Sequence, residues 1–148
     1  ETTLGNQSLE FRNPARNSLD TLDSKVNLSL TNVKWLGNIV DDMGFNYVEA
    51  SNKKFDYSML YFNYGEQKYA DETGFVQGNF TPSTLLVGTS WGTKLPFGHV
   101  GVTGKIVNHT LHTEKINGVL TDLGYYLNTK HFEFDVMISN FSTRCWYL

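Results

Sequence analysis

The stretch that decides the fold class reads FEFDVMIS, at residues 132–139. Apolar and polar side chains alternate along it, which is typical of a β-strand with one buried face. The alternation recurs in VNLSLT at 26–31 and in the aromatic run at 55–62. The best helical candidate, 35–43, is short and contains a glycine, and no window of a dozen residues has helical spacing of its apolar side chains. The chain is therefore predicted to be all-β.

The middle of the chain is expected to hold two strands joined by a loop. Residues 85–87 form a short apolar run, which is typical of a buried strand. Residues 99–107 are expected to form a second strand. Between them, 88–98 is predicted to be a loop, in which Pro96 and Gly98 prevent a helix.

The spacing of turn signals indicates the architecture. Asn117-Gly118 stands between two apolar segments and is the strongest hairpin signal in the chain. The alternation shifts phase at Asn32, which favours a β-bulge or a bend there. Turns recur at intervals of roughly eight to twelve residues, which suggests a sandwich or a closed barrel. We expect one domain over 1–148, built as an antiparallel β-sandwich.

Composition excludes several classes of protein. The chain has 148 residues, of which 40% are hydrophobic and 18% charged, so it is not a disordered segment. Its net charge is −3, whereas nucleic-acid binders and proteins held at anionic membranes normally carry a basic excess. No run approaches the roughly 18 apolar residues of a membrane helix. We therefore expect no nucleic-acid partner and no membrane insertion.

The single cysteine and the first residues carry further expectations. Cys145 has no second cysteine to pair with, which excludes a disulfide-stapled scaffold, and its apolar surroundings favour a buried strand residue. The chain starts without an initiator Met or a signal peptide. It is therefore interpreted as processed or as a fragment of something longer, and we favour a fragment.

One nucleophile motif occurs. Residues 88–92 read GTSWG, which matches the G-x-S-x-G nucleophile elbow with Ser90 as the nucleophile. Asp122 and His131 follow in the chain order of a hydrolase triad. The elbow requires a helix directly after the serine, and Pro96 and Gly98 follow instead. No enzymatic activity is expected, and a Ser90 hydrolase is kept as a minor alternative.

No metal or cofactor site is predicted. His109 and His112 are three residues apart, and odd spacing on a strand places two side chains on opposite faces. Asp41-Asp42 lacks the ligand spacing of an EF-hand loop. These groups are interpreted as surface or loop residues.

A binding surface is the remaining candidate site. Two segments, 88–98 and 108–118, combine hydroxyls, amides, an indole and lysines, which could together hold a glycan. A lysine could meet the carboxylate of an acidic sugar such as sialic acid. The candidate ligand-binding residues are Ser90, Trp91, Thr93, Lys94, Thr110 and Thr113, flanked by Asn108 and Lys115.

Residues 23–32, DSKVNLSLTN, resemble the first head strand of an adenovirus fibre. That family shows an acidic residue, a small residue and Lys, followed by alternating aliphatic residues that run to Leu-Thr. The aromatic run near 55–64 and the aromatic-rich end, 132–147, resemble inner strands of such heads. Residues 1–11 would correspond to the end of a fibrous shaft. The length is similar to that of a small head from a non-mammalian virus.

The resemblance implies a homotrimeric β-sandwich head that attaches a virion to a host cell-surface receptor, either a protein or a sialylated glycan. It places the protein on the virion surface, and in the host nucleus during assembly. No functional residue of the family can be carried over to this sequence. Two alternatives stay open: a monomeric lipocalin-like β-barrel that binds a small apolar ligand, and a bacterial adhesin module.

Overall fold

The structure is a computed structural model, and it describes residues 13–19, 26–35, 42–52, 55–112 and 114–147, with the backbone alone from 143 onward. Within these ranges the regular elements are one short 3₁₀-helix, η1 (Pro14–Leu19), and β-strands. The prediction of an all-β chain is confirmed.

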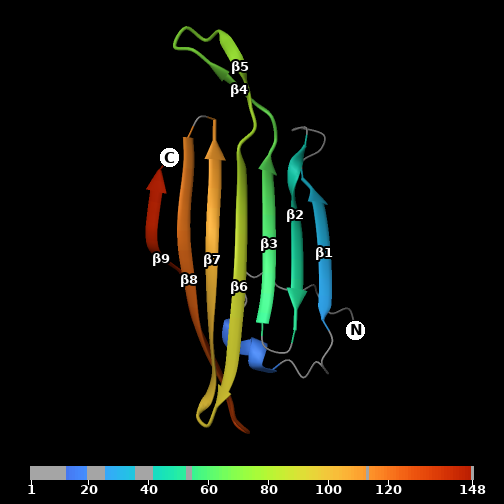
Figure 1. Cartoon of the computed structure of the whole chain (residues 1–148), viewed down its shortest axis with the longest axis vertical. Coiled ribbons are helices and arrows are strands. Elements are labelled where there is room, and N and C mark those ends of the chain that lie inside the picture. The colour runs from blue at the N-terminus through green and yellow to red at the C-terminus, as the bar shows by residue number, and fades with distance from the viewer. Residues whose placement is uncertain (1–12, 20–25, 36–41, 53–54, 113, 148) are drawn as a thin grey trace.

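Seven strands form one antiparallel sheet in the order β1-β2-β3-β6-β7-β8-β9 (Figure 1). Their bounds are β1 (Asn27–Lys34), β2 (Met43–Ser51), β3 (Phe55–Tyr64), β6 (Ser83–Leu95), β7 (Gly98–Leu111), β8 (Glu114–Asn128) and β9 (Glu133–Tyr147). Each strand pairs with the next one along the chain, except that β3 reaches β6 through an insertion. That insertion is a two-stranded ribbon of β4 (Gln67–Ala70) and β5 (Val76–Phe80).

The two ends of the sheet differ. At one end β6 returns into β7 through a tight turn, in which Gly98 has a φ of 139° that favours glycine. At the other end the β4–β5 ribbon projects beyond the sheet (Figure 1). The backbone N–H of Tyr64 donates to the carbonyl of Pro82 at 3.0 Å and closes the neck of this ribbon.

Alternate side chains of each strand point to opposite faces of the sheet, and the two faces differ in character. We call the buried side the polar face, because its buried side chains include Glu49, Asp56, Ser58, Ser90, Thr103, Lys105 and Asp122. We call the other side the apolar face. Its exposed side chains include Leu28, Leu30, Tyr57, Met59, Val87, Trp91, Val102, Ile106, Leu123, Val136 and Ile138.

Buried hydrophobic side chains are few. Among the described residues they are Ala15, Tyr47, Leu86 and Tyr126. An antiparallel sheet in water normally packs its apolar face on a core and leaves its polar face to solvent. In this sheet the arrangement is reversed: the buried face is rich in polar side chains, and the exposed face is apolar.

Several predicted strands are confirmed. Residues 26–31 fall largely in β1, 55–62 in β3, 99–107 in β7 and 132–139 largely in β9. The helical candidate at 35–43 cannot be compared over 36–41, which lie outside the described residues, and Met43 begins β2.

Three local predictions are wrong. Residues 88–95 belong to strand β6 rather than to a loop, because pairing with β7 satisfies the backbone as far as Leu95. Asn117-Gly118 lies inside β8, opposite Asn108 and Val107, so the hairpin turns before Glu114 instead. Pairing between β1 and β2 continues without a bulge through Asn32.

Candidate functional site

The polar face carries a ladder of polar side chains across four strands. Asp56 pairs with Ser90, Ser90 with Thr103, and Thr103 with Asp122, on β3, β6, β7 and β8 in turn. Each of the four is at most 3% exposed. The hydroxyls of Ser90 and Thr103 lie 2.7 Å apart and hydrogen-bond to each other. Buried polar groups normally have such partners, and this bond supplies one for the two central members of the ladder.

Next to the ladder lies a buried ion pair. Lys105 Nζ is 2.7 Å from Asp122 Oδ2, and both side chains are fully buried. The same Nζ donates to Asn140 Oδ1 at 3.2 Å, and the Asn140 backbone N–H donates to Asp122 Oδ1 at 2.8 Å. Buried charges of this kind require close geometry and extra hydrogen bonds to offset their desolvation. The cluster connects β7, β8 and β9.

A β-bulge supports this cluster. The pairing of β8 with β9 shifts register around Asp122, and Asn140 adopts a φ of 57° opposite the shift. Asparagine tolerates this left-handed conformation better than most residues. The bulge turns the Asn140 backbone toward the carboxylate of Asp122, which is a common use of bulges.

The helix η1 packs on the polar face where three glycines meet. Gly92, Gly101 and Gly124 pair with one another across β6, β7 and β8. A Cβ on Gly101 would lie 2.2 Å from the carbonyl carbon of Pro14, and a Cβ on Gly92 would lie 2.6 Å from the Pro14 oxygen. The three glycines therefore form a depression that admits the η1 backbone.

Hydrogen bonds fix η1 in the depression. The Asn13 amide nitrogen donates to the carbonyls of Tyr125 and Val136, each at 3.1 Å, and also to the Asp135 carboxylate. The Asn13 side-chain oxygen accepts from the Ala15 backbone N–H at 2.9 Å. One asparagine thus joins η1 to both β8 and β9.

Charged and titratable groups surround η1. Arg16 contacts Asp135 at 2.7 Å and Glu133 at 2.8 Å, and its guanidinium lies over the Tyr126 ring. The hydrogen bond to Asp135 raises the pKa of Arg16 above its ordinary value.

His99 meets η1 from strand β7. Its Nδ1 lies 2.6 Å from the Ser18 hydroxyl. Burial lowers the pKa of His99, and the positive charge of Lys94 lowers it further. Both effects favour a neutral imidazole beside η1.

The predicted ligand-binding residues are not brought together. Ser90 is buried on the polar face, whereas Trp91 and Thr93 point to the apolar face. Lys94 is exposed and pairs with His99. Thr110 lies at the far end of β7, roughly 26 Å from Val102, the partner of Trp91, at about 3.3 Å per residue.

Thr113 lies outside the described residues, so its part in the prediction has no structural counterpart. The two segments that carry the predicted residues, 88–98 and 108–118, are mostly strand rather than loop. Neighbouring strand residues face opposite sides of the sheet, so these segments do not present one continuous glycan surface.

The segment around Ser90 does not have the geometry that the hydrolase alternative requires. The GTSWG segment lies in the middle of β6, and the chain after Ser90 continues as strand to Leu95. The elbow geometry depends on a sharp strand-to-helix turn. Ser90 instead hydrogen-bonds to Thr103, and Asp122 pairs with Lys105. His131 lies in the turn between β8 and β9.

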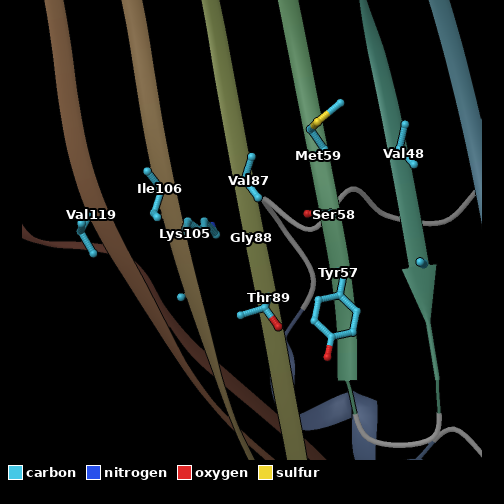
Figure 2. A pocket seen from close by; sticks show the side chains of 12 residues that line it. Val48, Tyr57, Ser58, Met59, Val87, Gly88, Thr89, Lys105, Ile106 and Val119 are labelled. Atoms are coloured by element: carbon cyan, nitrogen blue, oxygen red, sulfur yellow. The ribbon is translucent and has the colours of Figure 1, made fainter.

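The apolar face has a shallow hollow of about 610 Å³. Figure 2 shows Met59, Val87, Ile106 and Val119 along one side of it, with Tyr57 and Thr89 below. A Cβ on Gly104, in the floor of the hollow, would meet nothing within 4 Å.

Sequence reasoning missed the polar ladder and the ion pair. The available signal was the polar half of the alternating strands: within 55–62 and 99–107 it places Asp56, Ser58, Thr103 and Lys105 on one face. In a half-buried strand the polar half normally faces solvent, so this signal alone does not indicate a buried polar row.

Comparison with models of known families, with curated proteins and with solved structures finds no match for this chain. The resemblance to adenovirus fibre heads therefore stays a prediction. Among the described residues, no helix has the length and apolar character needed to cross a bilayer. The same part of the chain holds no group of three or more metal-ligating side chains.

Proposed function

We propose that the seven-stranded sheet is part of a membrane-embedded β-structure, with the apolar face toward lipid and the polar face toward an enclosed interior. The observation that carries this proposal is the reversal of the faces. Alternation of apolar-out and polar-in side chains is typical of transmembrane β-strands. In a water-soluble single-layer sheet the same alternation would leave the apolar face exposed to water.

Charge distribution supports the proposal. Three central rows of the apolar face run through Met59, Tyr57 and Phe55 of β3 and their paired neighbours. Among the described side chains these rows contain no charged group. Glu49, Lys105 and Asp122 all lie on the polar face. A charge at the lipid side of a membrane strand is costly, and the described charges of the central sheet avoid it.

Strand length is also suitable. Strands β6 to β9 contain 13, 14, 15 and 15 residues, and a tilted strand needs about 9–11 to cross the hydrocarbon core of a bilayer. At the tight-turn end, Phe97, Tyr125, Phe132 and Phe134 gather around the β6–β7 and β8–β9 turns. The Tyr125 hydroxyl donates to the Phe97 carbonyl at 2.5 Å. Aromatic girdles of this kind mark the margin of the apolar band in membrane β-proteins.

Closure of the sheet is part of the proposal. In the described structure β1 and β9 each have one unpaired edge. Unpaired backbone groups in lipid cost several kcal/mol each, on the order of the penalty for burial without a partner. We therefore infer that both edges pair with further strands, so that the polar ladder and η1 face a closed interior. The proposed activity is the enclosure of a polar passage or binding space across a membrane, narrowed by η1 at one end.

This proposal replaces the expectation of no membrane insertion, which considered helical spans and attraction to anionic membranes but not membrane-spanning strands. It also suggests an orientation. Membrane β-proteins have short turns on the periplasmic side and longer excursions outside. The β6–β7 turn would then be periplasmic, and the β4–β5 ribbon external.

The test compares two exposed apolar residues at different depths. Ile106 is 61% exposed at the centre of the apolar face, and Phe97 is 63% exposed at the tight turn. In a membrane, Ile106→Lys should cost about 2–4 kcal/mol of folding free energy and Phe97→Lys about 0–1. Both are measured by urea titration of protein folded into phosphatidylcholine vesicles. Equal, small effects would contradict lipid contact, because exposed substitutions in a water-soluble protein are nearly neutral.

A homotrimeric receptor-binding head remains the second candidate. The exposed apolar face favours it to the extent that symmetric copies could cover such a face. A β-sandwich head also requires a second sheet, and the described strands outside the main sheet are β4 and β5. This candidate predicts a solution mass of about 50 kDa in the absence of detergent. The membrane proposal predicts no stable, monodisperse species under that condition.

A further inference from the structure

Two buried polar side chains on the polar face have no hydrogen-bond partner among the described residues. Asn17 of η1 is 2% exposed, and neither atom of its side-chain amide finds a partner in that part of the chain. Ser58 of β3 is 5% exposed, and the same holds for its hydroxyl. Buried polar groups are nearly always hydrogen-bonded, either to protein or to a bound molecule, because an orphaned group costs free energy. The amide and the hydroxyl therefore mark places where a further molecule can bind.

The two side chains stand at the ends of one strip of the polar face. Asn17 packs on Gly92, since its Cβ lies 3.2 Å from the place that a Cβ on Gly92 would take. Gly88 precedes Gly92 by four residues on the same face of β6, and it pairs with Ser58. At about 3.3 Å per residue, roughly 13 Å separates the two ends. We call the strip between Asn17 and Ser58 the β3 lane.

The charged groups in and beside the β3 lane are already engaged. Lys105 is held by Asp122 at 2.7 Å. Glu49 accepts a hydrogen bond from the Tyr47 hydroxyl at 3.2 Å, and Asp56, inside the lane, also takes part in an interaction. The hydrogen-bonding capacity that remains belongs to a neutral amide and a neutral hydroxyl, and each of these can both donate and accept. This combination favours a neutral polar molecule over an ion.

The β8 side of the polar face differs, because its polar groups bond to one another. The Asn140 backbone N–H donates to Asp122 at 2.8 Å. The Asn13 amide donates to the carbonyls of Tyr125 and Val136. The capacity to bind a further molecule is thus concentrated on the β3 side of the interior.

We propose that the β3 lane binds small neutral polar molecules, of which water is the smallest; this inference rests on the proposed function, because it names the solute of the enclosed interior. The Asn17 amide offers two donors and an acceptor at one end, and the Ser58 hydroxyl offers a donor and acceptors at the other. Buried water molecules typically make about three hydrogen bonds to buried polar groups that otherwise lack partners. A molecule of this kind supplies what both side chains need without bringing a charge into the lane.

Hydration of the β3 lane can be measured by water-edited solid-state NMR of the protein in phosphatidylcholine vesicles. The readout is the rate at which magnetisation passes from water to each side chain. Thr103 is the matched control, because its hydroxyl is on the same face, is fully buried and is bonded to Ser90. We expect rapid build-up at Asn17 and Ser58 and slow build-up at Thr103. Slow build-up at both ends of the lane, or equally rapid build-up at all three residues, would overturn the proposal.

Ser58→Ala tests the role of the hydroxyl and is expected to fold, because it removes a single oxygen atom. Its control is Ser83→Ala, which removes a half-buried hydroxyl on the apolar face. We expect position 58 to lose its rapid build-up in Ser58→Ala, whereas Asn17 keeps its own in both variants. Rapid build-up that persists at position 58 would contradict binding by the hydroxyl.

Two further observations separate the parts of the proposal. Mn²⁺ added to the buffer should leave the signals of Asn17 and Ser58 sharp, and broadening of these signals would overturn the preference for neutral molecules. If the wild type fails to float with vesicles, the membrane location itself is contradicted. Flotation with slow build-up at Asn17 and Ser58 contradicts the β3 lane alone.

Discussion

Individual residues on the polar face are held by charge and hydrogen bonding rather than by apolar packing. Lys105 and Asp122 are the clearest case, since both are fully buried and lie 2.7 Å apart. The sequence pointed to Asp122 only as a member of a possible hydrolase triad and did not point to Lys105, because a lysine and an aspartate on alternating strands usually face water. Their pairing depends on a strand register that sequence patterns do not fix.

Breaking this pair should be strongly destabilising. Lys105→Met leaves the Asp122 carboxylate buried without its cation, so we expect a loss of about 3–5 kcal/mol in the free energy of unfolding. The double variant Lys105→Met with Asp122→Leu should recover most of the loss. Arg16→Gln is the control, because its ion pairs are exposed and should contribute at most about 1 kcal/mol. Equal losses for Lys105→Met and Arg16→Gln, measured by urea unfolding, would show that the buried pair contributes no more to stability than the exposed pairs.

Asp71 gives a pH prediction in the β4–β5 ribbon. Hydrogen bonds from Thr73, and then from the Gln77 side chain, lower the pKa of Asp71 to about 2. A lowered pKa stabilises the turn above the ordinary aspartate value of about 3.9, and the contribution disappears as pH falls through about 2. An NMR titration of the Asp71 carboxyl carbon should show this midpoint. Thr73→Ala should move the midpoint upward, and an unshifted midpoint would contradict the assigned cause.

Among the elements, η1 shows how a short segment can be positioned by glycines. Its backbone fits a depression that exists only because Gly92, Gly101 and Gly124 lack side chains. The partner of these glycines lies more than seventy residues away along the chain, and local patterns carry no information at that distance.

Two glycines of β7 provide a matched pair of variants. Gly101→Ala places a Cβ 2.2 Å from the Pro14 backbone, whereas Gly104→Ala meets open space. We expect a loss of about 1–3 kcal/mol for Gly101→Ala, as in other overpacked sites. Displacement of η1 should also speed tryptic cleavage after Arg16. If Gly104→Ala were cleaved as fast as Gly101→Ala, the glycine depression would not be what holds η1.

The strands themselves were predictable to the extent that their alternation was clean. The strands predicted at 55–62 and 132–139 follow from period two alone, and they correspond to most of β3 and to the first half of β9. The loop predicted at 88–98 is wrong because Pro96 and Gly98 mark only the turn between β6 and β7, whereas pairing with β7 extends β6 to Leu95. Asn117-Gly118 failed in the same way, since a strong local turn signal was overridden by pairing along the whole of β7.

For the whole molecule, alternation in the sequence gives the two faces but not the medium that each face meets. The predicted half-buried strands are present, and the buried half is the polar one. Only the assembled sheet reveals this, because burial depends on which elements cover each face. The candidate glycan site failed for a related reason: Ser90 and Trp91 are neighbours in sequence and lie on opposite faces.

The most direct test of the membrane location is the contact of Trp91 with lipid. Trp91 lies on the apolar face with 38% exposure, and Phe62 lies on the opposite face. With Trp35 and Trp146 replaced by Phe, Trp91 fluorescence should be quenched by phosphatidylcholine brominated on its acyl chains. In the matched control, Phe62→Trp is the only tryptophan and should not be quenched. Strong quenching at Trp91 and none at position 62 is the predicted result; no quenching at Trp91, or equal quenching at both, would contradict a sheet whose apolar face meets lipid.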